Sequence, residues 1–201
     1  MSELTVLQAV RLKGRVGEED LIATLDEDPT EVAATLTDLT AAGLLIQNKT
    51  LRVSPEGRER LNLLLAEERS EIDHNALAKS YDDFRAVNST FKALVSDWQI
   101  KDGQPNPHDD ADYDTAVLNR LDDVHEQVSP IVAAVTALVP RLSAYGKKLA
   151  AALGKVKAGD TAWLARPIID SYHTVWFELH EELIAASGLT REEEAKAGHA
   201  S

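Results

Sequence analysis

The sequence predicts a mainly α-helical protein in which short helices and one small β-hairpin precede an antiparallel helical bundle. Apolar residues recur three or four positions apart through most of the 201 residues, which is the spacing of one helix face. Two short apolar segments flank a tight turn, at residues 44–47 and 50–53, and predict the hairpin. Near residue 73 an alanine-rich segment begins that contains all three tryptophans. We therefore expect one unit over residues 1–72 and a second over residues 73–201.

The composition is typical of a globular protein without disulfides. Hydrophobic residues make up 44% of the chain, which is enough to bury a core. The absence of cysteine excludes disulfides, thiolate metal ligands and cysteine nucleophiles. No apolar run approaches the roughly 20 residues that a membrane helix needs, and the first residues do not resemble a secretory leader. We expect a cytoplasmic protein with no membrane association.

The charge balance bears on the kind of partner. The chain has 34 acidic and 21 basic residues, a formal net charge of −13. Residues 1–73 hold 15 acidic and 8 basic residues, a net charge of −7. Proteins that bind nucleic acid usually present a basic surface, so any DNA contact here has to come from a local patch.

Capping signals divide the first unit into four helices. Acidic residues at 18–20 are favourable in the first turn of the second helix. Asp28 and Pro29 form an N-cap and first-turn pair for the third helix, and Ser54 with Pro55 does the same for the fourth. Glycines are expected to end the first and third helices, at Gly14 and Gly43.

Two short sequence motifs lie at the ends of the third helix and of the hairpin: DLTAAGLL at residues 38–45 and VSPEGR at residues 53–58. With the order helix, helix, helix, hairpin, helix, they resemble winged-helix regulators of the broad MarR/PadR kind. The resemblance covers about residues 4–70. It implies a winged helix-turn-helix whose wing is the hairpin, and a DNA-binding transcriptional regulator that acts as a homodimer.

The resemblance also implies which side chains would meet DNA. Thr30 and Thr35 of the third helix would approach base edges, and Lys49 and Arg52 of the hairpin would hold phosphates. The third helix contains no lysine or arginine, and two of its acidic side chains repel phosphates: Glu31 and Asp38. The alternative is that this unit binds a protein and that its charges form a solvated surface.

The second unit is expected to form four or five antiparallel helices. The first of them, over residues 70–99, is expected to continue from the helix before it. A segment rich in glycine, proline and charge, about 101–111, is expected to be an exposed loop. The other helices are expected at 112–127, at 129–138 with Ser129 and Pro130 at its start, at 140–156 and from Pro167 to Gly188. Residues 190–193 could cap a short final helix within a frayed tail over about 190–201.

The segment 160–183, DTAWLARPIIDSYHTVWFELHEEL, is unusually rich in aromatic and histidine residues. It is faintly similar to helical segments of actinobacterial phosphoenolpyruvate-utilising, pyruvate phosphate dikinase-like proteins, over residues 74–187 at most. No phosphohistidine loop or nucleotide-binding signature accompanies it, so no catalytic residue can be carried over. This resemblance implies a non-catalytic adaptor or regulatory module beside such an enzyme, which is the alternative to DNA binding.

The same segment supplies most of a candidate pocket for an anionic or aromatic small-molecule effector. His173 and His180 are seven residues apart, about 10 Å along a helix, and can line one groove. The candidate lining residues are Arg85, Arg166, Tyr172, His173, Trp176 and His180. The competing interpretation, which we favour for Tyr172 and Trp176, is that they anchor the core with their polar atoms satisfied.

Two Asp-x-x-His pairs, Asp122/His125 and Asp170/His173, place a carboxylate and an imidazole on one helix face. Di-metal helical bundles use the related Glu-x-x-His spacing, and Asp82 or Asp83 could supply a further ligand. Local Asp–His hydrogen bonds are the simpler reading, so we expect no metal and no cofactor. No Ser-His-Asp order, Walker loop or Gly-x-Gly-x-x-Gly is present, so we do not expect an enzyme.

Overall fold

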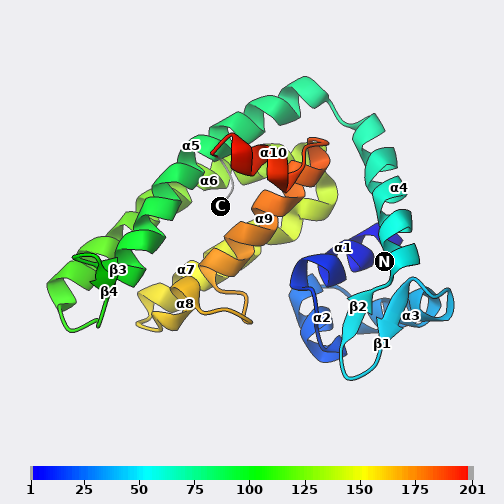
Figure 1. The fold of residues 1–201 in the computed structure, drawn as a ribbon, viewed down its shortest axis with the longest axis horizontal. Coiled ribbons are helices and arrows are strands. Elements are labelled where there is room, and N and C mark those ends of the chain that lie inside the picture. The colour runs from blue at the N-terminus through cyan, green and yellow to red at the C-terminus, as the bar shows by residue number, and fades with distance from the viewer. Residues whose placement is uncertain (1, 199–201) are drawn as a thin grey trace. The chain divides into compact units, whose positions relative to one another are not determined.

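The computed structural model describes residues 2–198 and divides the chain into two compact units, Met1–Ile72 and Asp73–Ser201 (Figure 1). The described residues form ten α-helices, one short 3₁₀ helix and two antiparallel two-stranded hairpins. The predicted mainly helical class is therefore confirmed.

The first unit follows the predicted order of elements. Asp28 caps the third helix by accepting hydrogen bonds from the backbone N–H groups of Thr30 and Glu31. Ser54 caps the fourth helix, because its hydroxyl accepts from the backbone N–H of Gly57. The elements are α1 (Glu3–Lys13), α2 (Glu18–Leu25), α3 (Pro29–Ala41), β1 (Leu45–Gln47), β2 (Leu51–Val53) and α4 (Pro55–Glu71).

The core of the first unit lies where α1 packs against α3, α4 and β2. Val16, between α1 and α2, forms a bridge with Leu51 of β2 through two backbone hydrogen bonds of 3.3 and 2.8 Å. The start of α4 approaches the backbone before β1 so closely that a Cβ atom on Gly57 would lie 2.0 Å from the carbonyl oxygen of Leu44. The hairpin is therefore held from both sides by backbone contacts.

The expected continuous helix across residue 72 is wrong. Ile72 has an extended backbone, with φ −88° and ψ 143°, and ends α4. The Asp73 carboxylate then caps α5 (His74–Gln99) by accepting from the backbone N–H groups of Asn75 and Ala76. An aspartate at this position stabilises a new helix start more than a continued helix.

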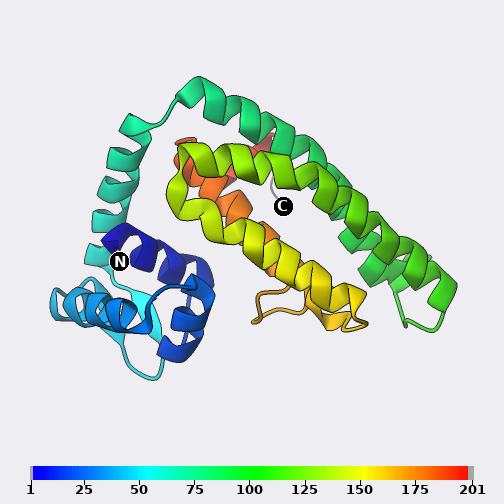
Figure 2. The same cartoon turned by 180° about the vertical axis from the view of Figure 1, so that it is seen from behind.

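In the second unit α6 (Ala111–Leu138) returns alongside α5, as both views show (Figures 1 and 2). α7 packs against α6, and α9 packs against α7. The remaining elements are β3 (Ile100–Lys101), β4 (Gln104–Pro105), the 3₁₀ helix η1 (Pro140–Leu142), α7 (Ser143–Lys157), α8 (Ala162–Ala165), α9 (Tyr172–Ala186) and α10 (Arg191–Lys196).

The segment 101–111, expected to be an exposed loop, is more ordered than its composition predicts. β3 and β4 form a small hairpin there. Asn106 is buried, and its amide donates to the Trp98 carbonyl oxygen at 3.1 Å and to the Asp114 carboxylate at 2.9 Å. The Nδ1 atom of His108 lies 2.9 Å from the same carboxylate. These hydrogen bonds hold the turn against the ends of α5 and α6, while most of the segment is exposed, as expected.

The helix start predicted at Ser129 and Pro130 is also wrong, because α6 continues through Pro130. Proline removes one backbone donor from a helix, but a continuous buried stripe on α6 outweighs that loss. The stripe consists of Val124, Val128 and Val132.

The last long helix begins later than predicted. Ser171, rather than Pro167, begins α9, since the Ser171 hydroxyl accepts from the backbone N–H of Thr174 at 3.3 Å. Ile168, which lies four residues before Tyr172 and would share its buried face in a helix begun at Pro167, has a positive φ of 77° and is 98% exposed. The cap at Ser171 therefore sets the start of α9, although the apolar spacing continues to residues before it.

The short final helix predicted from the capping signal at Thr190 is present as α10, so the tail expected from about residue 190 begins with a helix, and residues 199–201 lie outside the described part. Thr190 and Glu193 form a reciprocal capping box at the start of α10. Glu194 is 3% exposed and bonds to α5. A buried carboxylate with partners on another helix explains why this short segment is ordered.

Candidate functional site

The exposed face of α3 is acidic and polar. Thr30 is exposed, whereas Thr35 is half-buried and its hydroxyl donates to the backbone carbonyl oxygen of Glu31 at 2.9 Å. The hydroxyl of Thr37 donates in the same way to the Ala33 carbonyl oxygen. The hydroxyl hydrogens of Thr35 and Thr37 are thus used inside the helix, which leaves their oxygens as acceptors toward solvent.

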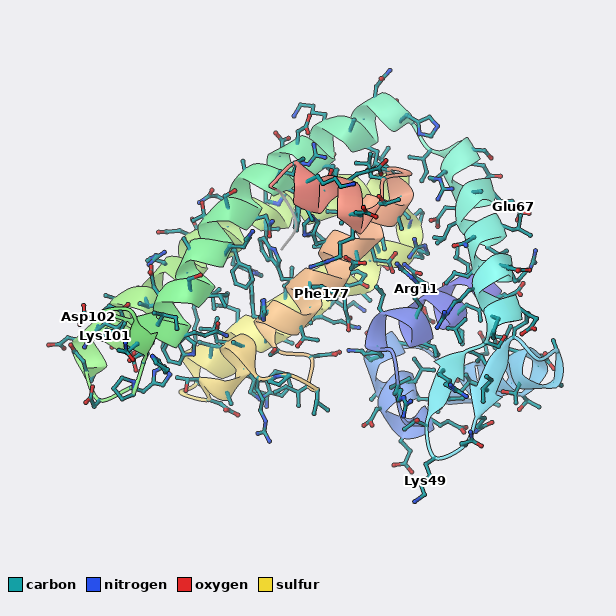
Figure 3. The ribbon with its side chains drawn as sticks, in the orientation of Figure 1. Arg11, Lys49, Glu67, Lys101, Asp102 and Phe177 are labelled. Atoms are coloured by element: carbon teal, nitrogen blue, oxygen red, sulfur yellow. The ribbon has the colours of Figure 1, made fainter. Side chains whose placement is uncertain are left out.

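Three basic side chains of the first unit lie in or beside the hairpin. Lys49 extends from the turn between β1 and β2 (Figure 3), and Arg52 is exposed on β2. The bridge between Val16 and Leu51 is antiparallel, so its register places Arg15 opposite Arg52. Within residues 2–198 no ion pair involves any of these three cations. Arg60 differs, because it forms a two-pronged ion pair with Glu3 at 2.8 to 3.3 Å.

Three of the six predicted pocket residues come together in the second unit. His173, Trp176 and His180 of α9 line a pocket of about 200 Å³ whose other wall is α5. Arg191, at the start of α10, also contributes. The remaining lining residues are Asn88, Phe91, Lys92, Val95, Ser96, Gln99 and Phe177, the last projecting from α9 (Figure 3).

The other three predicted pocket residues lie elsewhere. Arg166 lines a separate, shallower depression with Trp98 and His108. Tyr172 is fully buried, and Arg85 is committed to an ion pair with Glu194. Sequence spacing grouped the side chains on α9 correctly, but it could not tell which neighbouring helix each of them meets.

The pocket wall is positively charged and contains no carboxylate. Lys92 is half-buried, and within residues 2–198 it forms no ion pair. Arg191 binds Glu181 at 2.5 Å and places its guanidinium 4.7 Å from the centre of the Phe177 ring. Burial lowers the pKa of His180 to about 4, and partial burial lowers the pKa of His173. Both imidazoles are neutral at pH 7, and the charge of Arg191 is balanced by Glu181, so the net positive charge of the wall comes from Lys92.

A buried hydrogen-bond chain lies behind the pocket. The Tyr81 hydroxyl donates to Glu194 at 2.7 Å and lies 3.0 Å from Nε2 of His180. Since the hydroxyl hydrogen is used toward Glu194, the Tyr81 oxygen accepts from His180, which assigns the proton of the neutral imidazole to Nε2. Arg85 completes the chain by donating to Glu194 through Nε at 3.0 Å. Burial and the neighbouring Glu194 raise the pKa of Tyr81, which stays protonated.

Tyr172 and Trp176 are core residues, in agreement with the interpretation favoured for them. They are 0% and 2% exposed. The Tyr172 hydroxyl lies 3.1 Å from Nδ1 of His125, and the indole N–H of Trp176 donates to Asn88 at 2.9 Å. Trp176 therefore presents part of its ring to the pocket while its polar atom is satisfied inside the protein.

The two Asp-x-x-His pairs do not make local Asp–His hydrogen bonds. Asp122 binds Lys157 at 2.5 Å, and His125 binds Tyr172. Asp170 precedes α9, lies 3.5 Å from Lys148 and does not share a helix with His173. Over residues 2–198 no three histidine, aspartate or glutamate side chains are grouped as metal ligands.

Lys92, Phe177 and Arg191 complete the pocket, and they were not among the predicted residues. A signal for Lys92 exists in the sequence, because it lies three residues before Val95 and therefore shares a helix face with it. Arg191 could not be found in this way, since α10 reaches the pocket only through its contacts with α5 and α9.

Comparisons of the chain with protein-family models, with curated proteins and with solved structures give no match. None of the helices formed by residues 2–198 combines the length and the hydropathy that crossing a membrane requires.

Proposed function

We propose that the chain is a winged-helix transcriptional regulator of the MarR/PadR kind. Its first unit contacts DNA, and its second unit is a helical bundle for dimerisation or ligand sensing. The order α1, a bridging residue, α2, α3, β1, β2 and α4 supports this proposal. In a winged helix, a segment between the first two helices pairs with the last strand of the hairpin and adds a third strand to it. Val16, which lies between α1 and α2 and bridges to Leu51, is in this position.

The hairpin cations carry the DNA-binding part of the proposal. Arg15 and Arg52 lie opposite each other by register, and Lys49 occupies the turn beyond them. Three exposed cations that are free of ion pairs can each neutralise a phosphate. The acidic face of α3 offers no cation to a phosphate, so affinity comes from the hairpin. A homodimer doubles the number of hairpin contacts.

Regulation in this proposal is a population shift. A ligand or partner that binds one arrangement of the second unit more tightly favours that arrangement. In a dimer, a change in the arrangement of the second unit changes the spacing of the two winged helices. The affinity for a two-fold operator changes as a result.

An adaptor function is the second candidate, and the acidic face of α3 favours it. Glu31 and Asp38 are exposed on the helix that would enter the major groove. Since α3 has no lysine or arginine, a basic protein surface complements this face better than DNA does. In this case the chain is a non-catalytic module, docked on an enzyme such as the phosphoenolpyruvate-utilising kind.

A fluorescence anisotropy titration separates the two functions. The protein, with its fold confirmed by circular dichroism, is added to labelled DNA from the region upstream of its own gene, at about 50 and 200 mM salt. The regulator predicts sequence-selective binding that weakens as salt rises. Absence of binding at the lower salt rejects the regulator and leaves the adaptor.

A further inference from the structure

We propose that a depression between the end of α5, the start of α6 and α8 binds the phosphoryl group of a small phosphate monoester. These elements lie at one end of the second unit (Figure 1), and the depression has a volume of about 830 Å³. That volume is within the range of small-molecule sites, roughly 300–1,000 Å³. The depression is separate from the pocket between α5 and α9, and the proposal does not depend on DNA binding by the first unit.

A histidine and an aspartate form the fixed side of the depression. Nδ1 of His108 lies 2.9 Å from the Asp114 carboxylate, which only accepts, so the imidazole hydrogen is on Nδ1. Both amide hydrogens of Asn106 are used elsewhere, toward Asp114 at 2.9 Å and toward the Trp98 carbonyl oxygen at 3.1 Å. Nε2 of His108 has no hydrogen-bond partner among residues 2–198, so this atom is available to a ligand.

The backbone of His108 adopts a conformation that is rare outside glycine. Its φ of 57° is in the left-handed region. The backbone N–H of His108 donates to the side-chain oxygen of Asn106 at 3.1 Å, and the imidazole packs against Trp98 with ring centres 4.3 Å apart. Residues held in such conformations cluster at ligand sites, where the surrounding structure fixes them. The imidazole is therefore preorganised, and its side chain is still 41% exposed.

Arg166 supplies the positive charge for an anion. It follows α8 directly and lines the same depression. Its side chain is exposed and forms no ion pair or hydrogen bond within residues 2–198. Asp114 is the one carboxylate among the described lining residues, and both of its oxygens already accept hydrogen bonds. The guanidinium is thus free to hold two oxygens of a phosphoryl group in parallel.

The imidazole distinguishes a phosphoryl group from other anions. The second pKa of a phosphate monoester is about 6, so near neutral pH the group exists with and without a proton. The protonated form donates its hydrogen to the Nε2 lone pair of His108, and the dianion accepts from Nε2 when the imidazole holds that proton. A sulfate group has the same tetrahedral shape but no proton to donate, so it loses the first of these hydrogen bonds.

An apolar wall leaves room for the organic part of the ester. Leu118, Ala162 and Ala165 line the depression and are partly exposed. A phosphate ion held at Arg166 would leave this surface open to water. The alkyl part of a monoester would cover it, which favours the ester over the free ion.

Isothermal titration calorimetry of the full chain with n-butyl phosphate, near neutral pH, tests the proposal without DNA. The matched probes are n-butyl sulfate, which keeps the alkyl chain and the tetrahedral anion, and inorganic phosphate, which lacks the alkyl chain. We expect one butyl phosphate per chain, with affinity about tenfold above butyl sulfate, because a charge-assisted hydrogen bond to Nε2 is lost in the sulfate. Inorganic phosphate should also bind more weakly than butyl phosphate.

Two outcomes of this titration would contradict the proposal. Butyl phosphate that binds no better than butyl sulfate would overturn it, as would absence of binding. Inorganic phosphate that binds as tightly as butyl phosphate would reject the monoester and leave phosphate itself as the ligand.

The variant Arg166→Gln locates the site. It removes the cation, so the affinity for butyl phosphate is expected to fall about tenfold, while the urea unfolding curve stays the same because the side chain is exposed and unpaired. Arg58→Gln is the control, since Arg58 is also exposed and forms no ion pair within residues 2–198. Equal losses in both variants, or none in Arg166→Gln, contradict the proposed site.

The variant His108→Asn tests the imidazole separately. Asparagine tolerates the left-handed backbone, so the turn should keep its shape. We expect the preference for butyl phosphate over butyl sulfate to disappear, while the affinity for butyl sulfate changes little. A preference that survives the substitution would reject the role of His108. An equal loss for both ligands would reject it too, since His108 would then act only on the shape of the turn.

Discussion

The hydroxyl of Tyr81 on α5 donates to the carboxylate of Glu194 on α10 across 2.7 Å, and the two residues are 113 positions apart in the chain. Arg85, one turn further along α5, binds the other oxygen of the same carboxylate. Glu194 is buried, so these bonds replace the water that its charge would otherwise need. They hold α10 against α5 and thereby place Arg191 in the wall of the pocket.

Glu194→Gln is expected to loosen α10. The amide keeps the size of the side chain but cannot form the ion pair with Arg85, and we expect the free energy of unfolding to fall by about 1–3 kcal/mol. Hydrogen exchange measured by mass spectrometry should become faster over residues 191–196. Glu192→Gln is the control, since Glu192 is on the same helix but pairs with Lys196 in solvent. Equal exchange in the two variants would show that Glu194 does not hold the helix.

His180 makes the protein less stable in mild acid. Burial lowers its pKa to about 4 from an ordinary 6.5, and the nearby charges of Arg191, Glu181, Glu194 and Arg85 largely offset one another. Between these two values the unfolded chain binds a proton that the folded chain does not, so the free energy of unfolding falls as pH falls from 6.5 toward 4. The full difference corresponds to about 3 kcal/mol.

Urea unfolding at pH 7, 5.5 and 4.5 measures this dependence. His180→Gln should flatten it, even if the substitution lowers stability at every pH. His74→Gln is the control for the substitution itself, because His74 is exposed at the start of α5. The shifts of His125 and His173 have the same sign, so part of the dependence should remain in His180→Gln. An unchanged slope in His180→Gln would contradict the assignment.

Gly57 is required by the close approach of α4 to the hairpin. A Cβ atom there would lie 2.0 Å from the Leu44 carbonyl oxygen and 2.9 Å from a methyl group of Val53. We expect Gly57→Ala to lower the free energy of unfolding by about 3 kcal/mol or more, because backbone has to move. Gly154→Ala in α7 meets nothing within 4 Å and should raise it by about 0.5–1 kcal/mol. Circular dichroism during a urea titration measures both.

Local capping made the helices of the first unit predictable. Asp28 and Ser54 cap their helices by bonds to residues two or three positions away, so the relevant contacts are present in the sequence itself. The same logic explains two wrong boundaries. Asp73 and Ser171 are also local caps. Each begins a new helix, although the apolar periodicity continues across it.

The pocket was predictable on one side alone. His173, Trp176 and His180 share a face of α9, and helical spacing places them together without knowledge of the rest of the fold. Lys92 and Arg191 reach the same space because α5 and α10 pack around α9, and the order of packing is set by long-range contacts such as Tyr81 with Glu194. The continuation of α6 past Pro130 could not be predicted for a similar reason. The apolar stripe of α6 is buried only because α5 and α7 pack against that helix.

The hairpin cations give the proposed DNA contact a quantitative test. Each phosphate that a cation neutralises contributes about 0.9 to the slope of log affinity against log salt. Arg15→Ala combined with Arg52→Ala should therefore weaken binding to every DNA sequence and reduce that slope by about 2 per protomer, or about 4 for the homodimer. Anisotropy titrations at four salt concentrations measure the slope.

Lys196→Ala is the matched loss of charge, because Lys196 is exposed in the second unit and pairs with Glu192. It should leave the slope of the parent protein unchanged. If the double variant keeps the parent slope, the phosphates are held by other residues and the hairpin is not the contact surface. If it loses discrimination between sequences but keeps the slope, the arginines read bases rather than phosphates, and the assignment of roles to Arg15 and Arg52 is wrong.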